Sequence, residues 1–210
     1  MNKIKAILFD MDGVLIEAKD WHYEALNKAL SLFGCEISLY DHLVTFDGLP
    51  TRDKLNMLTK QGKLPKGLHT IINRMKQKYT MRIILNNCKP LFNHQYALSK
   101  LHSEGYKMAV CSNSIRKSVE VMIEQAGLDK YFEFYVSNED VSNGKPDPEM
   151  YSLAITKLGF DPKECLILED NENGIRAANA SGGHLLKIGE VTDVNYQNIR
   201  KRINELETKD

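Results

Sequence analysis

The chain has 210 residues, of which 42% are hydrophobic and 27% are charged, an ordinary composition for a globular protein. Its 28 Lys and Arg residues balance its 28 Asp and Glu residues, so no net charge favours binding to nucleic acid or to a membrane surface. We therefore expect neither partner, and the length suits one large domain or a core domain with a modest insertion.

The first predicted element is a short strand, the apolar run at residues 4–10. It is too short for a membrane span, and an acidic residue follows too soon for a signal peptide. We therefore expect a cytoplasmic protein. Separately, we expect a monomer.

The next segment, from residue 18 to about residue 90, contains no convincing strand. Helical patterns cover residues 20–33, 51–60 and 66–80, and a long connection runs from Asp41 to Pro50. The end of that connection, followed by Thr51, is typical of a loop that caps the next helix. The pattern predicts a helical insertion after the first strand.

Beyond residue 90, short apolar runs alternate with helical patterns. The predicted strands cover residues 106–112, 132–137, 165–169 and 184–189, and the predicted helices cover residues 91–104, 115–126, 148–159 and 173–181. Continuous apolar runs are typical of strands that are buried on both faces. The alternation predicts an α/β fold with a doubly wound, Rossmann-like parallel sheet.

Four cysteines lie far apart in the sequence and form no C-x-x-C pair: Cys35, Cys88, Cys111 and Cys165. A zinc or disulfide site would need cysteines that cluster with one another or with histidine. We expect reduced cysteines that pack in the interior.

Two acidic residues, Asp10 and Asp12, stand at the end of the first predicted strand, and Gly13 allows the chain to turn sharply after them. Alternate positions let both carboxylates face one site, and ligands bind at such strand ends in open α/β sheets. A calcium-binding EF-hand loop would need an oxygen ligand and a glycine where Val14 and Leu15 stand, so that alternative fails.

A second acidic pair, Glu169 and Asp170, ends the run at residues 165–169. Two carboxylate pairs at two buried strand ends would repel each other by several kcal/mol unless a cation lies between them. Oxygen ligands beside a substrate phosphate favour Mg²⁺. The alternative for either pair alone is a solvated end of a loop.

Two further segments carry polar groups that suit an anion. The run at residues 106–112 ends in Ser112, and Asn113 and Ser114 follow, so a hydroxyl and backbone amides lie before a helix. Ser112 could equally cap that helix. Lys145 stands in the stiff turn G-K-P-D-P, where an isolated lysine would usually be solvated.

In this order the four segments resemble the haloacid dehalogenase-like superfamily: D-x-D-G-V, a strand ending in serine, G-K-P-D-P, and L-E-D-x-x-x-G-I-x-A-A at residues 168–178. The resemblance covers residues 4 to about 189, including the helical insertion. It implies a catalytic core formed by residues 1–17 and 91–210, and a helical cap domain formed by residues 18–90.

The resemblance also implies the chemistry, a Mg²⁺-dependent hydrolysis of a phosphomonoester through an aspartyl-phosphate. Asp10 is then the nucleophile, and Asp12 protonates the leaving oxygen and later deprotonates water. Asp10, the backbone carbonyl of Asp12 and Asp170 hold Mg²⁺, and Glu169 lies in an outer position.

The remaining groups of the core bind the phosphoryl group. Ser112 and the Asn113 amide are expected to donate hydrogen bonds to it. Lys145 supplies a positive charge that also holds Asp10 ionised.

Within the superfamily, the cap and the motif forms look like the β-phosphoglucomutase and sugar-phosphate phosphatase branch, which implies a small sugar, polyol or amino-alcohol phosphate as substrate. His22 falls at the position of that branch's hinge histidine, although it could equally serve packing. Arg52 is the candidate for a phosphate site on the cap, although with Asp53 it could form a solvated helical turn.

Other functions fit parts of this pattern. A sugar-phosphate mutase is the main rival, but Ala18 stands where mutases keep a threonine, and the loop before Arg52 is one residue longer than theirs. A dehalogenase would not need Asp12. A receiver-like regulatory module that accepts phosphate on Asp10 would need neither the cap nor Asp12 as an acid.

Overall fold

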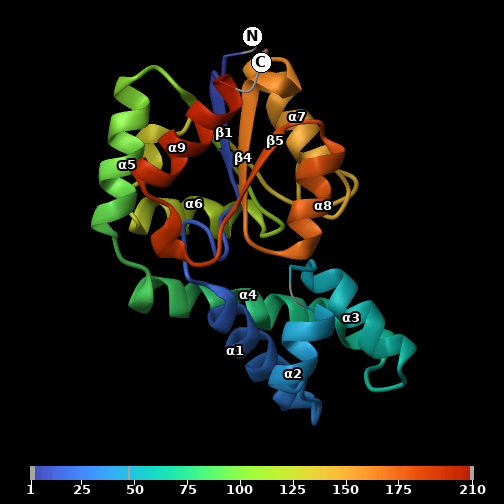
Figure 1. The fold of residues 1–210 in the computed structure, drawn as a ribbon. Helices are drawn as coiled ribbons and strands as arrows, with labels where there is room; N and C mark the ends of the chain where they lie inside the picture. Colours follow the sequence, from blue (N-terminus) through green and yellow to red (C-terminus); the bar gives the residue numbers. More distant parts are fainter. Residues whose placement is uncertain (1–2, 47, 209–210) are drawn as a thin grey trace. The chain divides into compact units, whose positions relative to one another are not determined.

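A computed structural model describes residues 3–46 and 48–208 of the chain, which folds into two compact units (Figure 1). The core unit combines the chain up to Glu17 with the chain from Lys89 onward, and the helical unit is Ala18–Cys88. The insertion between the first two strands is therefore helical, as the sequence predicts.

Five parallel strands form the sheet of the core unit: β1 (Ala6–Phe9), β2 (Lys107–Cys111), β3 (Phe134–Val136), β4 (Cys165–Glu169) and β5 (His184–Lys187). Their order is β3-β2-β1-β4-β5, and every neighbouring pair is parallel. Side chains on both faces of β1 are buried because helices cover both faces of the sheet. The predicted α/β parallel sheet is confirmed.

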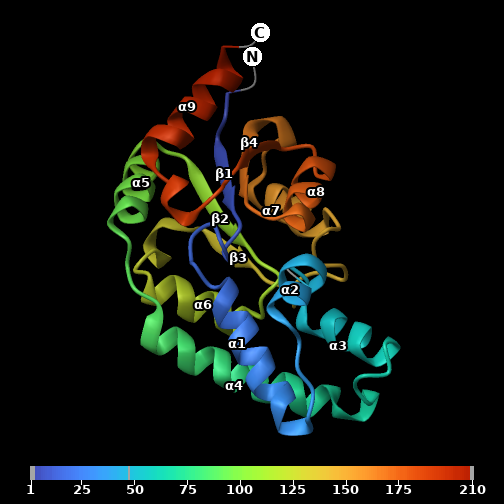
Figure 2. The same ribbon diagram turned by 60° about the horizontal axis from the view of Figure 1, so that its bottom comes forward.

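Helices cover the two faces of this sheet (Figures 1 and 2). On one face, α7 (Glu149–Leu158) and α8 (Glu172–Ala180) pack in one hydrophobic cluster with residues from four strands, including Cys111 and Cys165. On the other lie α5 (Phe92–Ser103), α6 (Arg116–Gln125) and α9 (Tyr196–Glu207). The sequence reading did not identify α9.

The helical unit contains α1 (Lys19–Leu30), α2 (Leu39–Asp41), α3 (Thr51–Lys60) and α4 (His69–Asn87). Short 3₁₀ segments at Ser31–Phe33 and Lys66–Leu68 lie beside α1 and α4. Leucine, isoleucine and phenylalanine side chains from these segments form a separate hydrophobic core. Each unit thus has an interior of its own.

The prediction of a loop from Asp41 to Pro50 is wrong over much of its length. A π-helical segment, His42–Phe46, continues from α2, and its two end side chains are both buried. Asp47 lies outside the described residues. Pro50, not Thr51, occupies the cap position of α3, and no side chain caps that helix.

No helix within residues 3–46 and 48–208 combines the length and the apolar character that a bilayer span requires.

Candidate active site

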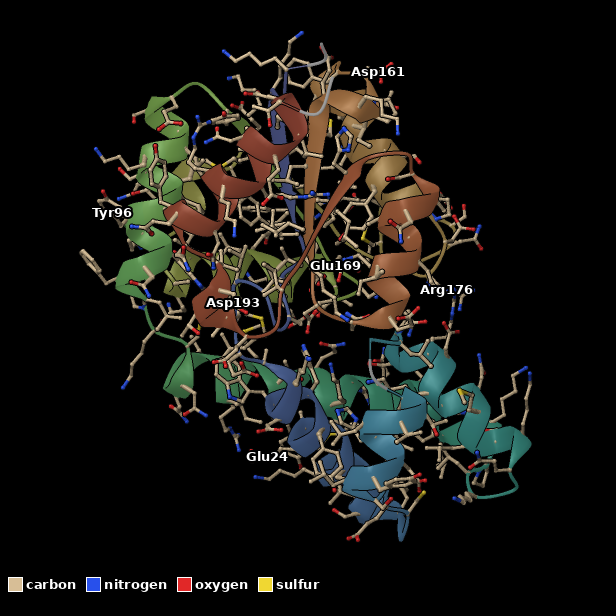
Figure 3. The ribbon with its side chains drawn as sticks, in the orientation of Figure 1. Glu24, Tyr96, Asp161, Glu169, Arg176 and Asp193 are labelled. Atoms are coloured by element: carbon tan, nitrogen blue, oxygen red, sulfur yellow. The ribbon has the colours of Figure 1, made fainter. Side chains whose placement is uncertain are left out.

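Three of the predicted site residues lie at the carboxyl edge of the sheet because they end parallel strands. Asp10 follows β1 and donates its backbone N–H to the Leu168 carbonyl of β4 (3.0 Å). Ser112 follows β2, and Glu169 is the last residue of β4. In Figure 3, Glu169 lies within the core unit, whereas Asp161 and Arg176 of the same unit lie at its periphery.

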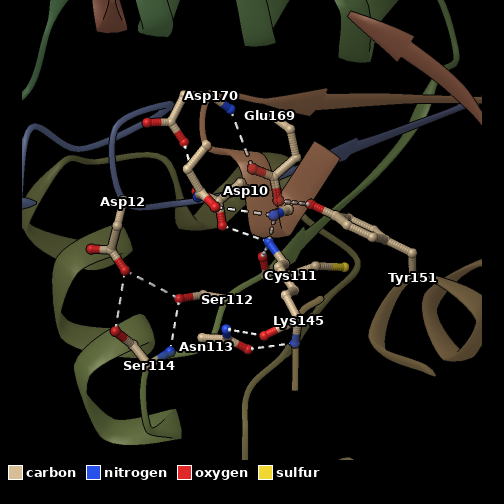
Figure 4. Close-up of polar contacts among 12 residues, drawn as sticks. Asp10, Asp12, Cys111, Ser112, Asn113, Ser114, Lys145, Tyr151, Glu169 and Asp170 are labelled. Atoms are coloured by element: carbon tan, nitrogen blue, oxygen red, sulfur yellow. Dashed lines mark hydrogen bonds and ion pairs between the residues drawn. The ribbon is translucent and has the colours of Figure 1, made fainter. Parts of the chain in front are cut away.

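Lys145 is buried, with 3% of its surface exposed, and joins two acidic residues of this edge (Figure 4). Its ammonium donates to Asp10 Oδ1 (2.6 Å), Glu169 Oε1 (2.6 Å) and the Cys111 carbonyl (2.8 Å). These three acceptors use all three N–H bonds of the lysine. The alternative of a solvated lysine is wrong.

Glu169 is completely buried and is contacted on several sides. The Tyr151 hydroxyl donates to its Oε1 (2.5 Å), and the Asp170 backbone N–H donates to its Oε2 (3.2 Å). A Cβ atom at position 174 would lie 2.0 Å from the Glu169 carboxyl carbon, so only glycine fits there. Sequence reasoning missed the roles of Tyr151 and Gly174, although both stand within or just after the quoted motifs.

Asp12 points toward the segment that follows β2 (Figure 4). Its Oδ2 accepts hydrogen bonds from the hydroxyls of Ser112 (3.3 Å) and Ser114 (3.2 Å). The Ser112 hydroxyl also accepts from the Ser114 backbone N–H (3.0 Å). Helix α6 begins at Arg116, so the interpretation of Ser112 as its cap is wrong, and Ser114 is a contact that the sequence reading left without a role.

The Asn113 side chain fixes the backbone of Lys145. Its Oδ1 accepts from the Lys145 N–H (3.0 Å), and its Nδ2 donates to the Lys145 carbonyl (3.2 Å). This paired contact links the segment after β2 to the G-K-P-D-P turn, where the Lys145–Pro146 peptide bond is cis. The side chain thus has a positioning contact, while the expected role of the backbone amide stays a prediction.

Three carboxylates meet in a group that suits a cation: Asp10, Glu169 and Asp170 each offer an oxygen, and these oxygens lie within 4.8 Å of one another. Among the described residues, Asp10 Oδ2 is buried without a hydrogen-bond partner. A hard cation such as Mg²⁺ prefers such oxygen ligands, so these residues fit a metal ion. The Asp12 carboxylate is not part of the group.

The electrostatics of Asp10 also call for a cation. Burial and the neighbouring Glu169 raise the pKa of Asp10 well above its usual range, although Lys145 lowers it. Burial alone would lower the pKa of Lys145, but Asp10 and Glu169 outweigh it and raise that pKa. Lys145 thus lowers the pKa of Asp10 against two opposing influences, and its expected role in holding Asp10 ionised stays a prediction.

The two candidates in the helical unit make contacts within that unit. The His22 Nδ1 lies 3.3 Å from the Lys76 ammonium of α4. Arg52 lies in the first turn of α3, where its side chain is 76% exposed and its Nε lies 3.6 Å from Asp53. Both proposed roles stay predictions.

Comparison with known proteins decides the family of this chain. The family model described as haloacid dehalogenase-like hydrolase matches residues 7–188. The chain belongs to this family. A phosphorylated carbohydrates phosphatase from Thermotoga maritima is 27% identical over 179 residues, which are 85% of this chain and 82% of the relative. Fructose-1-phosphate phosphatase YqaB from Escherichia coli is 26% identical over 176 residues, or 84% and 92% of the two chains.

Solved structures confirm the fold of this haloacid dehalogenase-like hydrolase. A β-phosphoglucomutase from Clostridium difficile aligns with a TM-score of 0.84 and 21% identity, covering 98% of this chain and 100% of that chain. The predicted membership in the branch with a helical cap is confirmed, and the protein is an enzyme of phosphatase type. The alternative of a receiver-like regulatory module is therefore set aside.

Proposed function

We propose that this enzyme is a Mg²⁺-dependent phosphatase that hydrolyses a small phosphomonoester through an aspartyl-phosphate on Asp10. The geometry of Asp10 carries the proposal. Lys145 holds one of its carboxylate oxygens, and the other is buried without a hydrogen-bond partner in the described part of the chain. A carboxylate held in this way has a fixed orientation, so its oxygens can serve both a cation and an attack on phosphorus.

The substrate is a sugar, polyol or amino-alcohol monophosphate. Two relatives whose alignments cover more than 80% of this chain are named as phosphatases of phosphorylated carbohydrates and of fructose 1-phosphate. Such substrates have alkoxide leaving groups, which need a proton as the P–O bond breaks.

Asp12 supplies that proton. In the first step, an Asp10 oxygen bonds to phosphorus while the ester P–O bond breaks and Asp12 protonates the leaving oxygen. In the second step, Asp12 takes a proton from water, whose oxygen attacks phosphorus, so phosphate leaves and Asp10 is regenerated. The hydrogen bonds from Ser112 and Ser114 to Asp12 Oδ2 keep this carboxyl group oriented toward the site.

Asp10 and Asp170 hold Mg²⁺ together with the Asp12 carbonyl, and Glu169 lies in an outer position. When bound, the ion would neutralise charge between the nucleophile and the phosphoryl oxygens. The fit of the three carboxylates and the raised pKa of Asp10 support this assignment.

The phosphoryl group is bound by Ser112, by the Asn113 backbone amide and by the charge of Lys145. Because the Lys145 ammonium already donates to three acceptors, it acts on the phosphoryl group through charge. In the helical unit, His22 and Arg52 are proposed to contact the rest of the substrate. A second phosphate site at Arg52 is what a mutase would need.

Phosphate release tests the proposal. Hexose, pentose, polyol and amino-alcohol monophosphates are incubated with the enzyme in Mg²⁺ and in EDTA, in parallel with Asp10→Asn. We expect release that needs Mg²⁺ and is lost in the variant. Release that persists in Asp10→Asn would overturn the nucleophile assignment, and isomerisation of a sugar 1-phosphate primed with bisphosphate, without release, would establish the mutase instead.

A further inference from the structure

Tyr151 lies in the buried cluster at the strand ends, although none of the proposed steps uses it. It is the third residue of α7 and is completely buried. Its hydroxyl donates to Glu169 Oε1 (2.5 Å), and its ring centre lies 4.7 Å from the Lys145 ammonium. Its side chain therefore contacts an acid and a base of the site at once (Figure 4).

The hydrogen bonds of Glu169 show what the phenol contributes. Glu169 Oε1 accepts hydrogen bonds from Tyr151 and Lys145, and Lys145 also donates to Asp10. Lys145 has no further N–H to offer, because its third donates to the Cys111 carbonyl. Without the phenol, Glu169 Oε1 would depend on Lys145 alone and would draw the ammonium away from Asp10.

Gly174 restricts the same carboxyl group from another side. A side chain at this position would overlap the carboxyl group of Glu169, with both oxygens about 2.0–2.1 Å from an added Cβ. The carboxylate thus lies against the backbone of α8 and receives the tyrosine hydroxyl. Its orientation is set by these contacts, with Oε2 next to the backbone N–H of Asp170.

We propose that Tyr151 is a positioning residue, which holds Glu169 so that Lys145 stays on Asp10 and the three acidic side chains keep the spacing that binds a cation. This inference rests on the proposed phosphatase function. Tyr151 acts through Glu169 and does not touch the reacting atoms.

The variant Tyr151→Phe tests this role because it removes only the hydroxyl and keeps the ring beside Lys145. We expect kcat to fall about 10-fold with KM changed less than about twofold, since the substrate contacts are kept. Mg²⁺ also raises the thermal unfolding midpoint in the proposed mechanism, and this rise can be titrated without substrate. We expect the Mg²⁺ concentration that gives half of the rise to be several-fold higher in the variant. Parental kcat and parental Mg²⁺ dependence would overturn the proposal.

A matched control separates this effect from the loss of any buried tyrosine hydrogen bond. Tyr106 is also buried, its hydroxyl bonds Arg200, and it precedes β2 at the opposite edge of the sheet. Tyr106→Phe should change the unfolding midpoint while leaving kcat and the Mg²⁺ dependence unchanged. A loss of kcat equal to that of Tyr151→Phe would show a general packing effect and would overturn the positioning role.

A double variant tests whether Tyr151 acts through Glu169. In the Glu169→Gln background, Tyr151→Phe should lower kcat by less than twofold, because the group that it positions is already altered. If the two substitutions lowered kcat independently, so that their fold-losses multiplied, the mechanism would be overturned. If the parental enzyme releases no phosphate from any substrate, the proposed function fails, but the Mg²⁺ titration of unfolding still decides the role of Tyr151.

Discussion

Two ion pairs in the core unit bring an acid and a base equally close but differ in their surroundings. The Arg116–Asp140 pair lies at 2.5 Å with side chains that are 38% and 23% exposed. The Lys145–Asp10 pair lies at 2.6 Å with side chains that are 3% and 6% exposed. Similar distances therefore occur in a partly solvated pair and in a buried pair.

The pKa values of the acidic residues in the two pairs are shifted in opposite directions. Burial is the largest single influence on the pKa of Asp140 and raises it, but the hydrogen bonds from Arg116 and Ser137 together outweigh it and lower that pKa to about 2. For Asp10, burial and Glu169 outweigh the lysine and raise the pKa. Asp140 accepts hydrogen bonds from Arg116 and from the backbone N–H and hydroxyl of Ser137, whereas Asp10 shares one base, Lys145, with Glu169. The hydrogen bonds of Asp140 therefore favour its charged form, whereas the burial of Asp10 and its acidic neighbours disfavour the charged form of that residue.

The largest expected effect comes from removing the acid of the buried pair. Asp10→Asn should reduce phosphate release by roughly 10⁴-fold or more, because a carboxamide is a poor nucleophile. The fold should remain intact, since one of several crowded acidic groups is removed. Single-turnover phosphate release and circular dichroism would measure the two effects.

The matched control is Asp140→Asn in the partly solvated pair. It should keep parental turnover, because its ion pair takes no part in the proposed chemistry. If Asp10→Asn retained substantial activity, or if both variants lost activity alike, the functional distinction between the two pairs would fail.

The next effect concerns Mg²⁺ binding to the three carboxylates Asp10, Glu169 and Asp170. Mg²⁺ at about 100 times its dissociation constant should raise the free energy of unfolding by about 2.7 kcal/mol, and EDTA should reverse the rise. The reason is that the ion binds the folded carboxylate group and relieves its repulsion. Thermal unfolding at constant ionic strength measures the shift.

Two variants sharpen this measurement. Asp170→Asn should lose most of the Mg²⁺-dependent rise, whereas Asp140→Asn should keep it. An equal rise in both variants would mean that the ion stabilises the protein elsewhere.

The same contrast explains what the sequence could reveal. Apolar runs and acidic residues at their ends predicted the parallel sheet and placed Asp10 and Glu169 at one edge, because strand direction fixes where strand ends meet. The burial of Lys145 could not be read from its turn, since that depends on contacts with Asp10 and Glu169, which are distant in sequence.

Other features could not be predicted from the sequence for related reasons. Tyr151 lies on an ordinary amphipathic helix, and only the tertiary structure shows that its hydroxyl meets Glu169. The π-helical segment His42–Phe46 lacked the longer periodicity that identifies a helix. The contacts of Asp12 with two serines depend on backbone geometry after β2, which no spacing rule specifies.

A smaller effect tests the space that Glu169 needs. Gly174→Ala should lower kcat roughly 10- to 100-fold, because the added Cβ would lie about 2.0 Å from the Glu169 carboxyl group and force it to move. Gly67→Ala is the control, since a Cβ there meets nothing within 4 Å. Steady-state kinetics compare the two. Parental kcat in Gly174→Ala would show that the position of Glu169 does not limit turnover.

The smallest expected effect belongs to the partly solvated pair and depends on pH. The pKa of Asp140 is about 2 in the folded protein, below its usual value of 3.8, so its charge stabilises the fold above pH 4. That contribution decreases as the pH falls through 2. Because solvent screens the pair, we expect Asp140→Asn to lose about 1 kcal/mol at pH 7. Urea unfolding should show about half of this difference at pH 3, and a difference that grew on acidification would mean that Asp140 has a raised pKa, like Asp10.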